Sequence, residues 1–113
     1  MIKMGRWKDV PPQEMEGLEG VRVRWVIGKE LNPPNFYMRV FEVEPGASTP
    51  YHSHPWEHES FILEGKAGIR FPDGSLKEAL PGTYVYIPPG EKHQFVNLGD
   101  ETLRFICVIP RQD

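Results

Sequence analysis

The chain has 113 residues, which is enough for one domain of ordinary size and too few for two independent hydrophobic cores. It contains 12 prolines and 11 glycines spread along its whole length, and this composition excludes long helices. The formal charge of -3 argues against nucleic acid as the main partner, because phosphate binding requires a concentrated basic face.

Cellular location and cysteine content further restrict the class of protein. No apolar run approaches the roughly 20 residues needed to span a bilayer, and residues 1–6 lack the apolar stretch of a secretion signal. We therefore expect a soluble, cytoplasmic protein without membrane contact. Cys107 is the only cysteine, which excludes intrachain disulfides and a cysteine-based zinc cluster. Any metal site must therefore use nitrogen and oxygen ligands.

The predicted elements are short strands. Residues 1–20 have no sustained period and are predicted to form an N-terminal arm anchored by Trp7, so that residues 21–113 make up the domain proper. Strict alternation over residues 21–27 predicts the first strand, and aromatic and branched residues predict a second over residues 36–44. Further strands are predicted over residues 60–63, 67–71, 76–80, 83–87, 94–97 and 103–109.

Turn sequences separate these strands. Residues 72–74 read Pro-Asp-Gly, a tight turn, and residues 81–82, 88–90 and 99–100 carry similar turn residues. About eight short strands without covering helices are expected to close on themselves as an antiparallel barrel or double-sheet roll. The predicted fold class is therefore all-β.

Histidine clustering is the main chemical signal. The four histidines are His52, His54, His58 and His93, and the first three lie within the segment HSHPWEHE. An isolated histidine is commonly a surface or core residue, but crowded imidazoles are difficult to satisfy by hydrogen bonds alone, and a shared cation satisfies them all. Imidazole is the favoured ligand for Zn, Cu, Ni and Fe and is acceptable to Mn. The sequence therefore predicts a metal site.

Two gapped patterns resemble the motifs of the cupin superfamily. The first cupin motif has a glycine, a His-x-His pair, a carboxylate and a second glycine at set intervals. Gly46, His52, His54 and Gly65 stand at four of these positions, while His58 replaces the usual carboxylate.

The second cupin motif is met at every position. It consists of a glycine, a proline, a glycine, a histidine and an asparagine at set intervals, and here these are Gly82, Pro88, Gly90, His93 and Asn97. Two long motifs in the right order identify the chain as a member of the cupin superfamily. Within it, the chain resembles the small manganese-binding monocupins known from Thermotoga, which have an all-histidine site.

This resemblance implies a single-domain jelly-roll barrel, the cupin double-stranded β-helix, and a homodimer. It also implies a divalent transition metal, manganese first and Fe, Ni, Cu or Zn as alternatives, with the ligands His52, His54, His58 and His93. Glu59 would restore a carboxylate to the site under a longer spacing of the first motif. Strand alternation favours His58, and participation of Glu59 stays open.

Pleat parity predicts the pocket walls. If His93 points inward, Phe95 does so too. On the last strand, Phe105 and Cys107 form the inward set, because Arg104 on the other face fits solvent better. Cys107 is then either a small buried apolar residue or an oxidisable group near a redox metal.

Arg39 is the remaining candidate pocket residue. It shares one face of the second strand with Tyr37 and Phe41, and parity does not decide whether that face is inside. If Arg39 points inward, it is the cation able to hold an anionic substrate, although a solvent-facing arginine is the commoner case.

The leading functional expectation is a metal-dependent oxidoreductase of the dioxygenase type, acting on a small organic substrate in the barrel. Four protein ligands on an octahedral metal leave two positions for oxygen or a chelating substrate. The alternatives are a non-redox isomerase or lyase that uses the metal as a Lewis acid, and a non-catalytic cupin that binds a small molecule. No catalytic residue is predicted, and acid–base work would fall to a metal-bound water, Glu59 or Tyr51.

Overall fold

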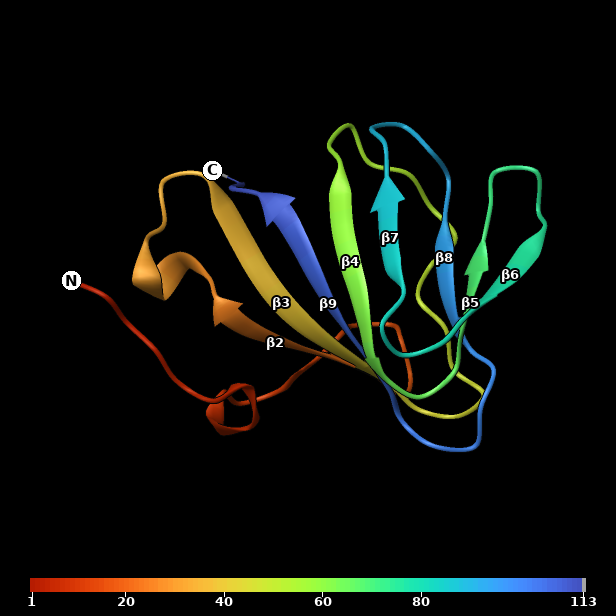
Figure 1. The fold of residues 1–113 in the computed structure, drawn as a ribbon, viewed down its shortest axis with the longest axis horizontal. Coiled ribbons are helices and arrows are strands. Elements are labelled where there is room, and N and C mark those ends of the chain that lie inside the picture. The colour runs from red at the N-terminus through yellow and green to blue at the C-terminus, as the bar shows by residue number, and fades with distance from the viewer. Residues whose placement is uncertain (113) are drawn as a thin grey trace.

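The computed structural model describes residues 1–112, which form two antiparallel sheets (Figure 1). One sheet has six strands in the order β1-β2-β3-β9-β4-β7, and the other has three in the order β6-β5-β8. The strands are β1 (Gln13–Glu14), β2 (Val21–Ile27), β3 (Phe36–Val43), β4 (His58–Glu64), β5 (Ala67–Arg70), β6 (Leu76–Ala79), β7 (Tyr84–Ile87), β8 (Gln94–Asn97) and β9 (Leu103–Pro110). The expected all-β double-sheet roll is confirmed.

Helical structure in the described residues is limited to the 3₁₀ turns η1 (Trp7–Asp9) and η2 (Lys29–Leu31). Neither turn is long and apolar enough to cross a membrane.

The structure adds detail around the first motif that the predicted strands did not contain. Strand β4 begins at His58, two residues before the predicted start at residue 60. His54 belongs to no strand, and His52 makes only an isolated antiparallel bridge with His93. The prolines at positions 50 and 55 account for this, because a proline cannot donate a ladder hydrogen bond.

Alternation along β9 and β3 determines which side chains enter the space between the sheets. In β9, Leu103, Phe105, Cys107 and Ile109 are buried, and the residues between them are half-buried. Strand β3 lies between β2 and β9 and places Arg39 opposite Cys107 in the register. The core therefore lies between the two sheets, and its edge passes into the histidine cluster.

Two glycines in left-handed conformation form turns that shape this region. Gly65 follows β4 with φ +88°, and a Cβ built there would lie 2.9 Å from Leu103 Cα. Gly90, with φ +79°, donates its N–H to the His54 carbonyl over 2.7 Å. The turn of the second motif is therefore tied directly to the histidine segment of the first.

The N-terminal arm packs on its own sheet. The Trp7 ring lies 5.3 Å from the Arg24 guanidinium and 5.5 Å from that of Arg104. Arg24 Nη1 also donates to the Val10 carbonyl over 2.7 Å, and residues 13–14 pair with β2 as its edge strand. Cation–π contacts and one strand pair therefore hold the arm against the barrel.

Candidate metal centre

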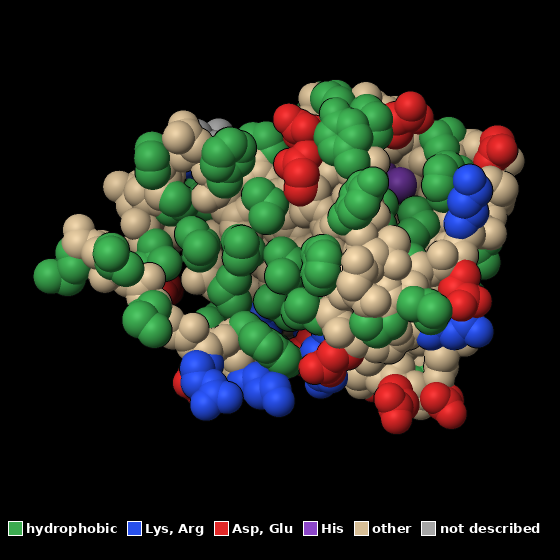
Figure 2. All heavy atoms as spheres, in the orientation of Figure 1, with side chains coloured by type: hydrophobic (Ala, Val, Ile, Leu, Met, Phe, Trp, Pro, Cys, Tyr) green, Lys and Arg blue, Asp and Glu red, His purple; other side chains and the backbone are tan. Residues whose placement is uncertain are grey.

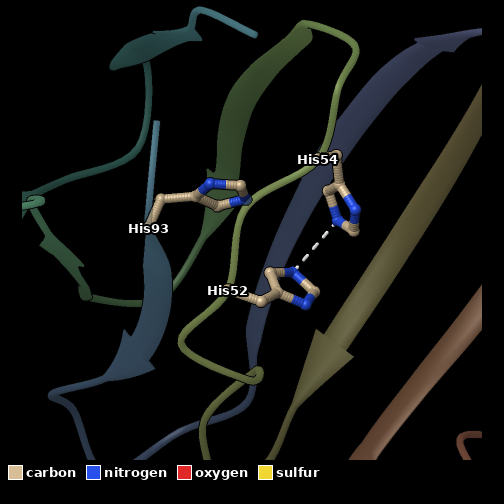
Figure 3. A group of neighbouring side chains, drawn as sticks. All are labelled: His52, His54 and His93. Atoms are coloured by element: carbon tan, nitrogen blue, oxygen red, sulfur yellow. Dashed lines mark hydrogen bonds between the residues drawn. The ribbon is translucent and has the colours of Figure 1, made fainter. Parts of the chain in front are cut away.

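Backbone pairing brings the two histidine segments together. His52 N donates to the His93 carbonyl over 3.1 Å, and His93 N donates to the His52 carbonyl over 2.9 Å. Neighbouring positions of an antiparallel pair present their side chains to one face, and both rings turn to the same space. Figure 3 shows the rings of His52, His54 and His93 gathered there, from segments far apart in the sequence.

Three of these imidazoles form a compact group. One ring nitrogen of each of His52, His54 and His93 lies within 4.8 Å of the others. His54 Nε2 and His52 Nε2 are only 3.1 Å apart, as the dashed line in Figure 3 marks. Nitrogen atoms converging at this spacing can share one cation.

His58 lines the same pocket without belonging to that compact group. Its ring centroid is 4.9 Å from that of His54 and 5.0 Å from that of His93. His58 Nδ1 lies 3.2 Å from Cys107 Sγ, while Nε2 is buried and has no hydrogen-bond partner. The structure therefore brings all four predicted rings together, and the role of His58 as a ligand stays a prediction.

Neighbouring groups fix the orientation of the rings. His93 Nδ1 lies 2.9 Å from the Glu91 carbonyl, so it donates there and leaves Nε2 with a free lone pair. The His54 ring stacks on Trp56 at 4.8 Å between centroids and 4° between planes. Such outer contacts hold metal-binding imidazoles in place.

Burial favours the uncharged form of His52, His54 and His58. Loss of solvation, followed by the charge of His93, lowers the pKa of His58 to about 3. Loss of solvation, followed by the charge of His52, lowers the pKa of His54 to about 4. The pKa of His52 is lowered as well, for the same primary reason. A neutral imidazole is the form that binds a metal.

The cluster opens into a pocket of about 160 Å³. Its lining consists of Met15, Arg39, Phe41, Thr49, Pro50, His52, His54, His58, His93, Phe95, Phe105 and Cys107. All eight residues expected from the sequence, the four histidines with Arg39, Phe95, Phe105 and Cys107, lie in this wall. None of the lining residues has a carboxylate.

Aromatic rings form one wall of the pocket. The Phe105 ring stacks on Phe95 at 4.1 Å and on Phe41 at 5.2 Å, with interplanar angles of 10° and 8°. The result is three nearly parallel rings beside the imidazoles. A flat apolar group can pack along such a wall.

Arg39 and Cys107 contact each other beside His58. Arg39 Nη2 donates to Cys107 Sγ over 3.2 Å, so the face of β3 that parity left open points inward at Arg39. Burial raises the pKa of the Cys107 thiol and outweighs the opposite effect of Arg39. Cys107 is therefore a buried, neutral thiol at neutral pH.

The two side chains considered for acid–base work lie outside this pocket. Glu59 is exposed, on the opposite face of β4 from His58. Tyr51 donates its hydroxyl to the Phe71 carbonyl over 2.7 Å. Neither residue lines the pocket. Alternation along β4 points Glu59 away from it, and the hydrogen bond to Phe71 holds the Tyr51 hydroxyl outside it.

Four lining residues lie outside the predicted set: Phe41, which shares the face of Arg39 that parity left open, and Met15, Thr49 and Pro50, which were not anticipated. Thr49 Oγ1 accepts a hydrogen bond from Phe95 N over 2.9 Å, which fixes this wall. Thr49 lies between Gly46 and His52 of the first motif, and this position in the sequence could have indicated that it lines the pocket. Met15 comes from the arm, and no pattern in the sequence indicates where the arm packs.

The sequence and the fold are similar to those of known proteins. The structure matches that of the polyketide cyclase RemF from Streptomyces resistomycificus with a TM-score of 0.92 and 37% identity. The match covers 99% of this chain and 81% of that chain. A glucose-6-phosphate isomerase from Pyrococcus abyssi is 38% identical over 65 residues, which are 53% of this chain and 34% of the isomerase.

A predicted oxalate decarboxylase from Thermotoga maritima has a TM-score of 0.83 over 97% of this chain and 100% of the other, at 22% identity. A likeness at that identity shows the fold alone, so the finer resemblance to manganese-binding monocupins stays a prediction. Residues 39–109, well over half of the chain, match the cupin domain family. The second cupin motif is met at every position and the first at all but position 58, the two sheets form the jelly roll, and the chain belongs to the cupin family.

Proposed function

We propose that this protein is a metal-dependent enzyme that cyclises or rearranges a small carbonyl compound without a change in the metal's oxidation state. The observation that carries the proposal is one pocket lined by four imidazoles and stacked phenyl rings, without a carboxylate. The likeness to a polyketide cyclase over nearly the whole chain supports it, as does the shorter likeness to an isomerase. A cyclase and an isomerase both rearrange atoms within one substrate molecule.

His58 is included as the fourth ligand. Its buried Nε2 lacks a hydrogen-bond partner, and a buried polar atom left unpaired in this way is costly. A metal shared with His52, His54 and His93 would satisfy that nitrogen. An all-imidazole set suits Zn, Cu, Ni or Fe and is acceptable to Mn, which the family resemblance puts first.

The bound ion would supply Lewis acidity that polarises a carbonyl oxygen. The chain's own residues hold and orient the reactants. The phenyl wall excludes water from one side of the pocket, and Thr49 is engaged with Phe95. Of the lining residues, none is a carboxylate or tyrosine able to take up a proton. Substrates whose reacting C–H bond is acidic enough to give up its proton to solvent water, such as β-dicarbonyl compounds, therefore suit this pocket.

Metal analysis of protein purified without added metal tests the site. We expect about one divalent ion per chain, which is lost in His52→Ala and His58→Ala. Glu59→Ala is the matched control, since Glu59 is exposed beside His58 and should retain the ion. A His52→Ala protein with unchanged metal content would contradict the ligand assignment.

The reaction class is tested in D₂O without oxygen. We expect the loaded protein to accelerate deuterium exchange, followed by NMR, at the carbon between the two carbonyl groups of a β-dicarbonyl probe above its spontaneous rate, and to do so equally with and without oxygen. Metal-dependent oxygen uptake coupled to product would instead support the oxidoreductase expectation, which the likenesses do not specifically support. Tight, metal-dependent retention of the probe without acceleration of exchange would favour a binding protein.

A further inference from the structure

Arg39 is a charged group of the pocket without a counter-ion. Its Nε is fully buried and has no hydrogen-bond partner. Its Nη2 donates only to the sulfur of Cys107. Within residues 1–112, no carboxylate forms a salt bridge with Arg39, whereas Arg22, Arg24 and Arg104 all pair with glutamates. Arg39 therefore differs from the structural arginines of the same sheet.

Two aromatic rings hold the Arg39 guanidinium in place. Its carbon Cζ lies 4.8 Å from the Phe41 ring centroid and 5.2 Å from that of Trp25. These cation–π contacts fix its position but do not neutralise its charge. Arg39 is half-buried with its Nε out of contact with solvent, and a partly buried cation without an anion favours uptake of an anionic partner from the pocket.

The rest of the lining leaves this positive charge uncompensated. The other eleven lining residues are histidines, apolar side chains, Thr49 and Cys107, and none is acidic. A pocket lined by one sign of charge attracts ligands of the opposite sign. Any divalent ion held by the imidazoles would increase the excess of positive charge.

We propose that Arg39 binds an anionic oxygen of the substrate, so that the pocket takes an organic anion, a carboxylate or enolate attached to a flat apolar group. The substrate class rests on the proposed function, whereas the Arg39 contact itself does not require the metal. The flat group packs along the parallel rings of Phe41, Phe105 and Phe95. A space of 160 Å³ corresponds to about five waters, so it holds a small ligand or the charged end of a longer one.

Benzoate and benzamide form a suitable probe pair, because they have nearly the same shape and only benzoate is charged. Calorimetric titration of the purified protein, with its metal content measured, compares their affinities. We expect benzoate to bind at least tenfold more tightly than benzamide. In Arg39→Met we expect at least a tenfold loss for benzoate and less than a twofold change for benzamide.

Two further variants separate binding from folding and from net charge. Arg39→Lys retains the positive charge and should keep most of the preference for benzoate. Lys77→Met removes one positive charge from the exposed strand β6 and should leave both affinities unchanged. Equal affinities for the two probes in the native protein would overturn the proposal. It would also fail if folded Arg39→Met, verified by thermal melting, bound benzoate as the native protein does.

The same titration on chelator-treated, metal-free protein distinguishes this proposal from the proposed function. A preference for benzoate that depends on Arg39 should persist there, although both affinities fall if the metal also contacts the carboxylate. Protein that never binds metal but retains the preference would refute the proposed function and support the Arg39 site. Protein that binds metal but lacks the preference would refute the Arg39 site alone.

Discussion

The sulfur of Cys107 lies between the His58 ring and the Arg39 guanidinium, with nitrogen–sulfur distances of 3.2 Å on both sides. If His58 Nδ1 donates its proton to this sulfur, Nε2 retains the lone pair that a metal requires. Groups that orient a metal-binding histidine in this way are important for metal affinity. We therefore expect Cys107 to position His58, in addition to filling space in the core.

Substitution of Cys107 tests that role. Cys107→Val keeps a buried side chain but removes the acceptor, so metal affinity should fall about 10- to 100-fold. Cys107→Ser retains an acceptor and should stay close to the native affinity. Both affinities are measured by competition with a chromogenic chelator. Native affinity in Cys107→Val would show that the sulfur only fills space.

Gly65 gives a second prediction for a single residue. Gly65→Ala places a Cβ 2.9 Å from both Leu103 Cα and the Thr102 carbonyl oxygen, at φ +88°. Strained backbone of this kind costs about 1–3 kcal/mol, and the backbone contact adds to it. Gly74→Ala is the control, because φ is also positive there but nothing lies within 4 Å. Urea unfolding should show the larger loss for Gly65→Ala, and equal losses would contradict the packing argument.

A buried carboxylate on β3 connects this strand to its two neighbours, β2 and β9. Glu42 is 1% exposed and accepts hydrogen bonds from Arg24 Nε over 2.9 Å and from Arg104 Nε over 2.8 Å. Burial alone raises the pKa of Glu42, but the hydrogen bonds and charges of the two arginines together outweigh it and lower the pKa below its usual 4.5. The ionised form of Glu42 therefore stabilises the contact between β2, β3 and β9.

The pH dependence of stability follows from this lowered pKa. As pH falls, the unfolded chain takes up the proton first, so the contribution of Glu42 is complete above pH 4.5 and is lost towards the lower folded-state pKa. Glu42→Gln should lower the free energy of unfolding by about 2 kcal/mol at pH 7 and by less in acid. Urea titrations at several pH values measure this difference.

Glu64→Gln serves as the control for the Glu42 experiment. Glu64 also accepts a hydrogen bond from Arg104, but its side chain is 52% exposed. An exposed ion pair contributes about 0–1 kcal/mol, so this variant should unfold nearly as the native protein does. A loss in Glu64→Gln as large as that in Glu42→Gln would contradict a special role for the buried carboxylate.

At the scale of the whole molecule, the outer face of the six-stranded sheet carries exposed apolar side chains. Antiparallel sheets that cover a core on one side are commonly polar on the other. Here Phe61 and Tyr84 are paired across β4 and β7, with exposures of 43% and 80%, and Tyr86 and Phe36 are exposed as well. Figure 2 shows hydrophobic side chains across the middle of this view, over the strands of the large sheet. We propose that a second copy of the chain covers this face, which gives the expected homodimer.

Light scattering during size exclusion tests the dimer. The native protein should have twice the chain mass at micromolar concentration, and Tyr84→Lys should shift it towards the monomer. Leu76→Lys, at an exposed apolar site on β6 of the smaller sheet, should leave the mass unchanged. A native monomer would contradict the proposal.

Much of the architecture was predictable because local patterns carry it. Alternation located β2, aromatic and branched residues located β3, and turn residues separated the shorter strand-like runs that follow, β9 included. The parity of β9 also indicated that Phe105 and Cys107 point inward, because successive strand residues face opposite sides. The start of β4 was missed because His58 and Glu59 are polar and do not look like the beginning of a strand.

Residue type and spacing by themselves determined the all-β class, the cupin motifs and the set of four histidines, because these properties are local. Only the tertiary structure decided that His93 pairs with His52, that Arg39 faces inward and that Cys107 lies against His58. It also decided that the arm contributes Met15 to the pocket wall. These facts depend on which strands become neighbours and on which face of each strand meets the core. Such pairing is set by the packing of the entire chain, and no short segment specifies it.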